Sequence, residues 1–103
     1  MKYEGVDRTI NEWASENSLK LVTAWQGGEC RACYTSSPQG ESFQISIEPP
    51  TAGYIGIDAW SVETLNDEEL HERWLVPVGS LRNALDTSLA KVTEWKLRNE
   101  KTA

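Results

Sequence analysis

Side chains suited to catalysis are scarce in this sequence. Its 103 residues include a single histidine, His71, and two cysteines, Cys30 and Cys33. The Gly-x-Ser-x-Gly, P-loop and Gly-x-Gly-x-x-Gly patterns are all missing, so three common enzyme classes lose their signatures. We therefore expect no catalytic residues and no cofactor, although two carboxylates brought together by the fold would leave no trace in the sequence.

Long hydrophobic runs are missing as well. No stretch approaches the roughly 20 apolar residues that cross a bilayer, and residues 1–5 lack the apolar run of a secretion signal. This pattern predicts a cytoplasmic protein with no membrane partner. Thiols in the cytoplasm are normally kept reduced, so Cys30 and Cys33 are not expected to form a disulfide there.

Basic residues are in the minority. Ten Lys and Arg residues stand against sixteen Asp and Glu, which gives a formal charge of -6. A negative surface repels phosphate backbones and attracts cationic surfaces. The composition therefore disfavours nucleic acid as a ligand and favours a basic protein partner.

The length and the apolar content indicate one small folded domain. Hydrophobic residues make up 39% of the chain, which is enough to offset the entropy of ordering it. Neither a repeat nor a linker divides the sequence. Residues 1–103 are therefore interpreted as a single domain.

Hydrophobic periodicity predicts a helix, a run of strands and a second helix. Apolar residues at helical spacing mark residues 7–17 and 80–98. Between them the period changes to two, which predicts strands at about 19–25, 30–35, 42–48, 54–63 and 73–78. We expect an α+β two-layer sandwich, in which an antiparallel meander sheet of four or five strands carries both helices on one face.

The first helix has two candidate N-caps. Thr9-Ile10-Asn11-Glu12 fits a capping box, and Asp7 is the competing cap. The start of this helix is therefore left open over two residues.

Strand parity predicts what the sheet face without helices carries. If the aliphatic residues Ile55, Ile57 and Ala59 point toward the helices, residues of the opposite parity point to solvent. Those residues are Tyr54, Asp58, Trp60 and Val62. An exposed Trp beside a carboxylate is typical of a protein-binding hot spot. A single β-bulge would reverse the arrangement.

An acidic stretch runs from Glu63 to Glu72 and surrounds His71. It lacks the order of an EF-hand loop, so no metal site is predicted. It is interpreted either as a solvated turn, capped by Asn66 or Asp67, or as an electrostatic docking surface. The acidic stretch and the outward residues of the strand at 54–63 together form the predicted partner site. Its residues are Tyr54, Asp58, Trp60, Glu63, Asp67, Glu68, Glu69 and Glu72.

The sequence Cys30-Arg31-Ala32-Cys33 has the spacing of a redox or zinc motif. It lies in a predicted strand, whereas a redox C-x-x-C normally opens a helix. Residues three apart in a strand point to opposite faces, so the two sulfurs should not meet. We therefore expect two free thiols.

The leading hypothesis is a non-enzymatic protein-binding module with an acidic, aromatic docking surface for a basic partner. One form of it is an immunity or inhibitor protein that masks a toxin. The alternative is a small-ligand module with a pocket between helix and sheet, or on the concave side of the sheet. Its expected lining is Trp25, Tyr34, Trp74, Arg31 and Gln44. A homodimer through an edge strand, and an enzyme with carboxylates assembled by the fold, also remain open.

Overall fold

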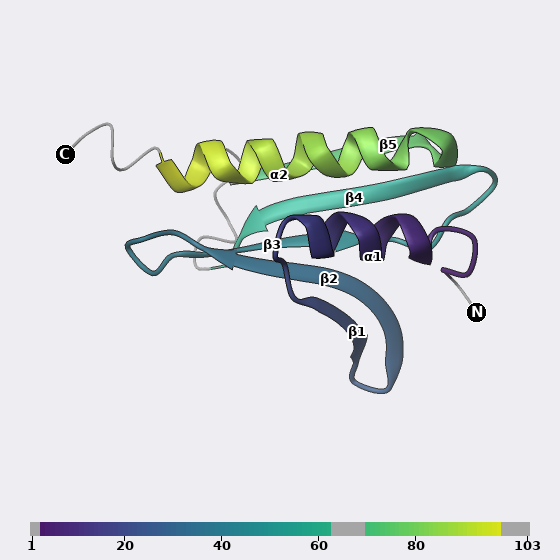
Figure 1. The fold of residues 1–103 in the computed structure, drawn as a ribbon, viewed down its shortest axis with the longest axis horizontal. Coiled ribbons are helices and arrows are strands. Elements are labelled where there is room, and N and C mark those ends of the chain that lie inside the picture. The colour runs from purple at the N-terminus through teal and green to yellow at the C-terminus, as the bar shows by residue number, and fades with distance from the viewer. Residues whose placement is uncertain (1–2, 63–69, 98–103) are drawn as a thin grey trace.

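The computed structural model describes residues 3–62 and 70–97. Two helices lie on one face of a five-stranded antiparallel sheet (Figure 1). The helices are α1 (Asp7–Glu16) and α2 (Leu81–Leu97), and a short 3-10 turn, Val78–Ser80, leads into α2. The strands have the same order in the sheet as in the chain: β1 (Leu21–Trp25), β2 (Gly28–Ser36), β3 (Ser42–Ile47), β4 (Tyr54–Ser61) and β5 (His71–Pro77). The predicted α+β meander with both helices on one face is confirmed.

The core lies between the two helices and one face of the sheet. Its side chains come from alternate residues of β3 and β4 and from one face of each helix: Phe43, Ile45, Ile47, Ile55, Ile57, Ala59, Ile10, Trp13, Leu85 and Val92. Burying one large aliphatic or aromatic side chain contributes about 1.5–3 kcal/mol. Because apolar residues alternate with polar ones along the strands, only one face of the sheet is apolar, and the helices cover that face. Ile55, Ile57 and Ala59 face the helices, as strand parity predicted.

Element boundaries lie within two residues of the prediction, and neither N-cap predicted for the first helix is used. Helix α1 begins at Asp7 itself, and Val6, in the capping position, makes no side-chain hydrogen bond to the helix. Thr9 lies inside the first turn. The cap prediction was wrong because the Asp7 carboxylate is bound by Arg31 on the sheet.

The hairpin between β1 and β2 bends away from the rest of the sheet. Trp25 pairs with Gly28, so Gln26 and Gly27 form the loop, and both have positive φ angles of 50° and 81°, as a type I′ turn requires. The register shifts at a β-bulge between Val22 and Ala24, and bulges bend and twist a strand. Figure 1 shows β1 and the adjoining end of β2 curling away from the helices.

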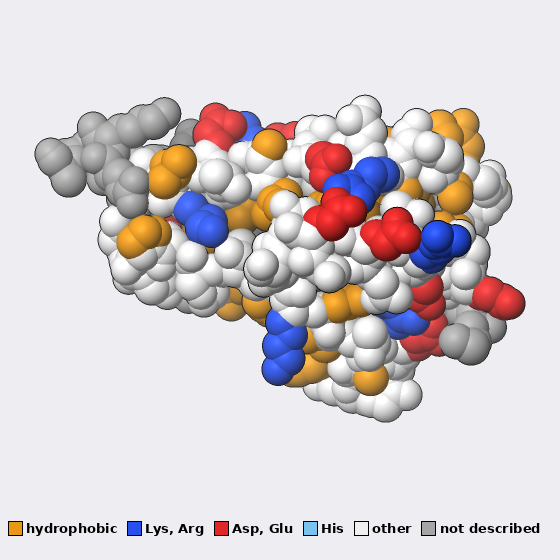
Figure 2. Space-filling model, in the orientation of Figure 1, with side chains coloured by type: hydrophobic (Ala, Val, Ile, Leu, Met, Phe, Trp, Pro, Cys, Tyr) orange, Lys and Arg blue, Asp and Glu red, His pale blue; other side chains and the backbone are white. Residues whose placement is uncertain are grey.

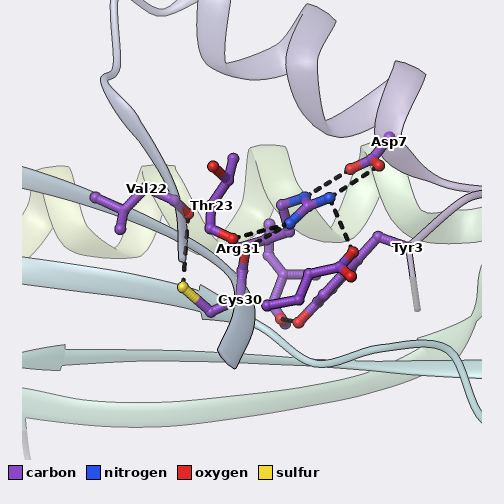
Figure 3. Close-up of polar contacts among 8 residues, drawn as sticks. Tyr3, Asp7, Val22, Thr23, Cys30 and Arg31 are labelled. Carbon is purple, nitrogen blue, oxygen red and sulfur yellow. Dashed lines mark hydrogen bonds and ion pairs between the residues drawn. The ribbon is translucent and has the colours of Figure 1, made fainter. Parts of the chain in front are cut away.

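Arg31 ties the start of α1 to the sheet (Figure 3). Its Nε donates to Asp7 Oδ1 at 2.6 Å, and its Nη2 donates to Asp7 Oδ2 at 2.9 Å and to Glu29 Oε1 at 3.1 Å. The guanidinium carbon lies 4.4 Å from the centre of the Tyr3 ring, whose hydroxyl donates to the Ile47 carbonyl at 2.8 Å. The hydrogen bonds from Arg31 lower the pKa of the Asp7 carboxyl. The N-terminal segment is therefore fastened to both β2 and β3.

Candidate functional site

The sheet face opposite the helices, called here the uncovered face, gathers large side chains that remain exposed. Directly opposed residues of an antiparallel sheet share a face. The register therefore places Tyr34, Gln44, Trp60 and His71 in one row across β2, β3, β4 and β5. Four exposed large hydrophobic side chains lie on this face: Trp25, Tyr34, Tyr54 and Leu75.

The helix side of the molecule has a different character. Figure 2 shows acidic and basic side chains mixed over the helices. Arg82 of α2 pairs with Glu16 of α1 and with Asp86, and Arg8 pairs with Glu12 at 3.0 Å. Exposed ion pairs of this kind are worth about 0.2–1 kcal/mol each. Paired charges thus cover the helices, while large exposed rings gather on the uncovered face.

Asp58, Trp60 and Tyr54 all lie on the uncovered face, as the parity of β4 predicted. Trp60 is half-buried, and its ring meets the His71 ring edge-on, with the ring centres 6.3 Å apart. Asp58 Oδ1 lies 3.5 Å from His71 Nε2. Tyr54 is exposed at the opposite end of the strand. The structure therefore brings Asp58 and Trp60 together and sets Tyr54 apart from them.

The remaining predicted site residues do not join this pair in the described part of the chain. Glu72 pairs with Ala59 and therefore points to the helix-covered face, away from Trp60. Trp74 pairs with Ile57 and points the same way. The other acidic residues lie outside the described residues, as does the predicted capped turn: Glu63, Asp67, Glu68 and Glu69.

Arg73 of β5 reaches across β4 and binds two carboxylates. Its Nη1 donates to Asp58 Oδ2 at 2.5 Å and to Glu48 Oε1 at 3.0 Å, and its Nη2 donates to Glu48 Oε2 at 2.8 Å. These contacts lower the pKa of the Glu48 carboxyl and raise that of the Arg73 guanidinium. Two ionised carboxylates and one guanidinium give these three side chains a net charge of -1. We call this group the Arg73 triad.

Gly56 makes room for the triad. A Cβ atom added at this position would lie 2.5 Å from Glu48 Oε2 and 2.7 Å from Arg73 Nη2. Both are ends of flexible, partly exposed side chains, so Gly56→Ala should keep the fold and displace Glu48 from Arg73. We expect the pKa of Glu48 to rise toward that of an ordinary glutamate, measured by an NMR pH titration of its carboxyl carbon. Gly79→Ala is the matched control because its added Cβ meets nothing within 4 Å. An unchanged Glu48 titration in Gly56→Ala would contradict this role.

Two hollows adjoin on the uncovered face and share Ser46. The hairpin hollow, of about 380 Å³, lies beside the bent hairpin. Its lining includes Trp25, Tyr34, Gln44, Ser46, Val22, Cys30 and Ala32. The carboxylate hollow, a shallow depression of about 460 Å³, is lined by Ser46, Glu48, Asp58, Trp60 and His71. Both volumes fall within the range of ligand and anchor pockets, about 300–1,000 Å³.

The predicted ligand pocket is only partly assembled. Trp25, Tyr34 and Gln44 border the hairpin hollow, on the concave side of the sheet. Arg31 also borders it, but its guanidinium is held by Asp7 beneath α1. Trp74 points to the helix-covered face. The hollow therefore lies on the uncovered face rather than between helix and sheet.

The carboxylate hollow brings a serine, an aspartate and a histidine together without forming a catalytic triad. Ser46 lies on β3, Asp58 on β4 and His71 on β5, so the aspartate strand separates the other two. A nucleophilic serine needs a histidine within hydrogen-bond reach. Ser46 Oγ instead accepts a hydrogen bond from Gln44 Nε2 at 2.8 Å. Among the residues that line this hollow, serine and histidine are therefore not arranged as a nucleophile and its base.

The two cysteines are free and point to opposite faces of β2, as predicted. Cys33 is buried under the helices, and this burial raises the pKa of its thiol to about 11. Cys30 is half-exposed and borders the hairpin hollow. Because the thiolate is the reactive form, we expect iodoacetamide to alkylate Cys30 in the folded protein and to reach Cys33 only after unfolding. Peptide mass spectrometry of briefly treated protein measures this, and comparable labelling of both residues would contradict it.

Comparison of the chain with protein-family models, with curated proteins and with solved structures finds no match. Across residues 3–62 and 70–97, neither helix is long and apolar enough to cross a membrane. The functional argument therefore depends on the residues of the uncovered face alone.

Proposed function

We propose that this chain is a non-enzymatic protein-binding module whose uncovered face docks a basic partner. One observation carries the proposal: large exposed side chains gather on the sheet face that no described helix covers. Trp25 is 66% exposed and Leu75 is 64% exposed, whereas Trp13 and Trp95 are buried in the core. Tryptophan and tyrosine are enriched in protein interfaces and at their hot spots.

The charge of the chain supports a basic partner. The protein carries a formal charge of -6, and the Arg73 triad places a net charge of -1 at the centre of the uncovered face. Such a field speeds the encounter with a cationic surface and weakens as salt is added. An immunity- or inhibitor-type protein that masks the cationic site of a nucleic-acid-acting toxin is one form of this function.

The chemistry of the carboxylate hollow supports binding over catalysis. General acid catalysis by a carboxyl group requires a raised pKa, so that the group is protonated near neutral pH. Arg73 lowers the pKa of Glu48 instead. Glu48 is therefore suited to holding a cation and not to donating a proton.

The test uses a defined basic probe. A Gly-Ser peptide with spaced Arg and Lys residues is titrated into the ¹⁵N-labelled protein, and NMR shift changes are mapped. We expect changes at Trp60, Tyr34 and the Trp25 indole, with affinity that falls as salt rises. Truncation at a hot spot costs more than about 1 kcal/mol, so Trp60→Ala should weaken binding about fivefold or more.

Two controls make the result specific. The same peptide with Glu in place of each basic residue should leave the spectrum unchanged. Glu94→Gln on α2, whose side chain is 66% exposed, should bind the basic peptide like the parent protein. Shifts confined to the helix side, or equal binding of both peptides, would remove the case for a docking face.

A further inference from the structure

The hairpin hollow is lined by two exposed aromatic side chains and by the uncharged polar side chains of Gln44 and Ser46. Trp25 and Tyr34 border it and are both exposed. Gln44 and Ser46 supply the polar groups, and Gln44 Nε2 donates to Ser46 Oγ at 2.8 Å. That bond uses the amide nitrogen of Gln44, while its carbonyl oxygen is an acceptor group. The hollow therefore offers aromatic rings together with neutral acceptors.

Positive charge bordering this hollow is already neutralised. Arg31 is the one Lys or Arg among its described lining residues. Its side chain is only 8% exposed and is bound to the carboxylates of Asp7 and Glu29. Net negative charge lies nearby, because Ser46 also borders the carboxylate hollow, which contains Glu48 and Asp58 of the Arg73 triad. The electrostatics of the hollow therefore suit a cation.

We propose that the hairpin hollow seats an arginine side chain of the basic partner, against Trp25 and Tyr34. This inference rests on the proposed docking function and identifies the side chain that anchors it. A guanidinium is planar and weakly hydrated, and it stacks on aromatic faces while its five N–H groups donate to neutral acceptors. An ammonium group is compact and strongly hydrated, so it loses more hydration on entering a hollow whose available acceptors, Gln44 and Ser46, are uncharged.

The test compares peptides that differ at one residue. A Gly-Ser peptide with flanking lysines carries arginine, lysine or the neutral isostere citrulline at its centre, and NMR titration gives the affinity of each. A cation–π contact at an exposed site contributes about 0.5–1 kcal/mol. We therefore expect the arginine peptide to bind about two- to fivefold more tightly than the citrulline peptide, and more tightly than the lysine peptide because the weakly hydrated guanidinium stacks on the rings, with the largest shifts at Trp25 and Tyr34.

Variants of the protein locate the effect. Trp25→Ala should abolish the preference for arginine, whereas Leu75→Ala should keep it. Leu75 is a matched control because it is equally exposed on the same face but lies on β5, at the opposite edge of the sheet. The free energy of unfolding of each variant, measured in urea, verifies that both remain folded.

Failure of this inference differs from failure of the docking function. Equal affinities for arginine and citrulline would show that the hollow takes a neutral group, such as a small ligand, and would overturn the inference. Equal affinities for arginine and lysine would overturn it as well. If Trp25→Ala keeps the preference for arginine while Trp60→Ala lowers the affinity for every peptide, the docking function is supported and the arginine site is disproved. If no basic peptide changes the NMR shifts of residues on the uncovered face, both proposals are disproved.

Discussion

Replacing Arg31 with methionine is expected to lower the free energy of unfolding by about 2–3 kcal/mol. The Arg31 side chain is 8% exposed, and its loss leaves Asp7 and Glu29 without their cation. Removing one partner of a buried ion pair costs about 3–5 kcal/mol. We expect less because both carboxylates retain some contact with water. Methionine keeps the apolar stem of arginine, so the change removes the guanidinium with its charge and hydrogen bonds and little of the packing.

Urea unfolding of Arg31→Met measures this loss, and Arg8→Met is its control. Arg8 also pairs with a carboxylate, that of Glu12, but its side chain is 92% exposed. Such a pair contributes at most about 0.5 kcal/mol on a helix surface. If both variants lost equal stability, the anchoring of α1 through Arg31 would be disproved.

The same variant should show a smaller defect in acid. Arg31 lowers the pKa of Asp7 in the folded protein, below the ordinary value of 3.8. The stability gained from this pair is therefore present above that value and is lost as the pH falls through the folded-state pKa. The difference in unfolding free energy between the parent and Arg31→Met should shrink over this acidic range.

Local alternation in the sequence was enough to predict the layers of the fold. Phe43, Ile45 and Ile47 alternate with polar residues, so one face of β3 had to be buried and the other had to remain polar. The same parity placed Trp60 on the uncovered face with Asp58. The irregularity lies between β1 and β2, where Thr23 faces both Cys30 and Arg31, and β4 keeps its parity.

Contacts between strands far apart in sequence could not be predicted in the same way. Arg73 reaches Glu48 from 25 residues away, which depends on the register of β5 against β4. That register, in which Arg73 pairs with Asp58, is not contained in the alternation of either strand, and β5 itself begins at His71, two residues before the predicted start. The sequence alone does not show that Gly56 lies under the Arg73 triad, because this depends on where the side chains of Glu48 and Arg73 lie.

Strand parity alone places several further residues of the site. Ser46 and Glu48 follow the polar parity of β3, so the alternation already placed them on the same face as Gln44. Arg31 and Tyr34 differ in parity, and a regular strand sends such residues to opposite faces. Both residues border the hairpin hollow, but the guanidinium of Arg31 is turned to Asp7 on the helix-covered side, as its parity indicates.

Trp13→Ala should lower the free energy of unfolding by about 3–5 kcal/mol, the range for truncating a large buried aromatic residue. Trp13 is fully buried in the core cluster between α1 and the sheet. Its Nε1 has no hydrogen-bond acceptor in the part of the chain described by the structure, and an unsatisfied buried donor costs about 1–3 kcal/mol. Trp13→Phe removes that donor along with some packing, so it should cost far less than the alanine variant.

The comparison with Trp25 separates folding from binding. Trp25 is 66% exposed, so Trp25→Ala should change the unfolding free energy by no more than about 0.5 kcal/mol. It should nevertheless abolish the arginine preference, while Trp13→Phe should leave peptide binding intact. Urea unfolding and peptide titration on the same three variants measure both effects. A large loss of stability in Trp25→Ala would mean that this ring is needed for folding and is not held ready for a partner.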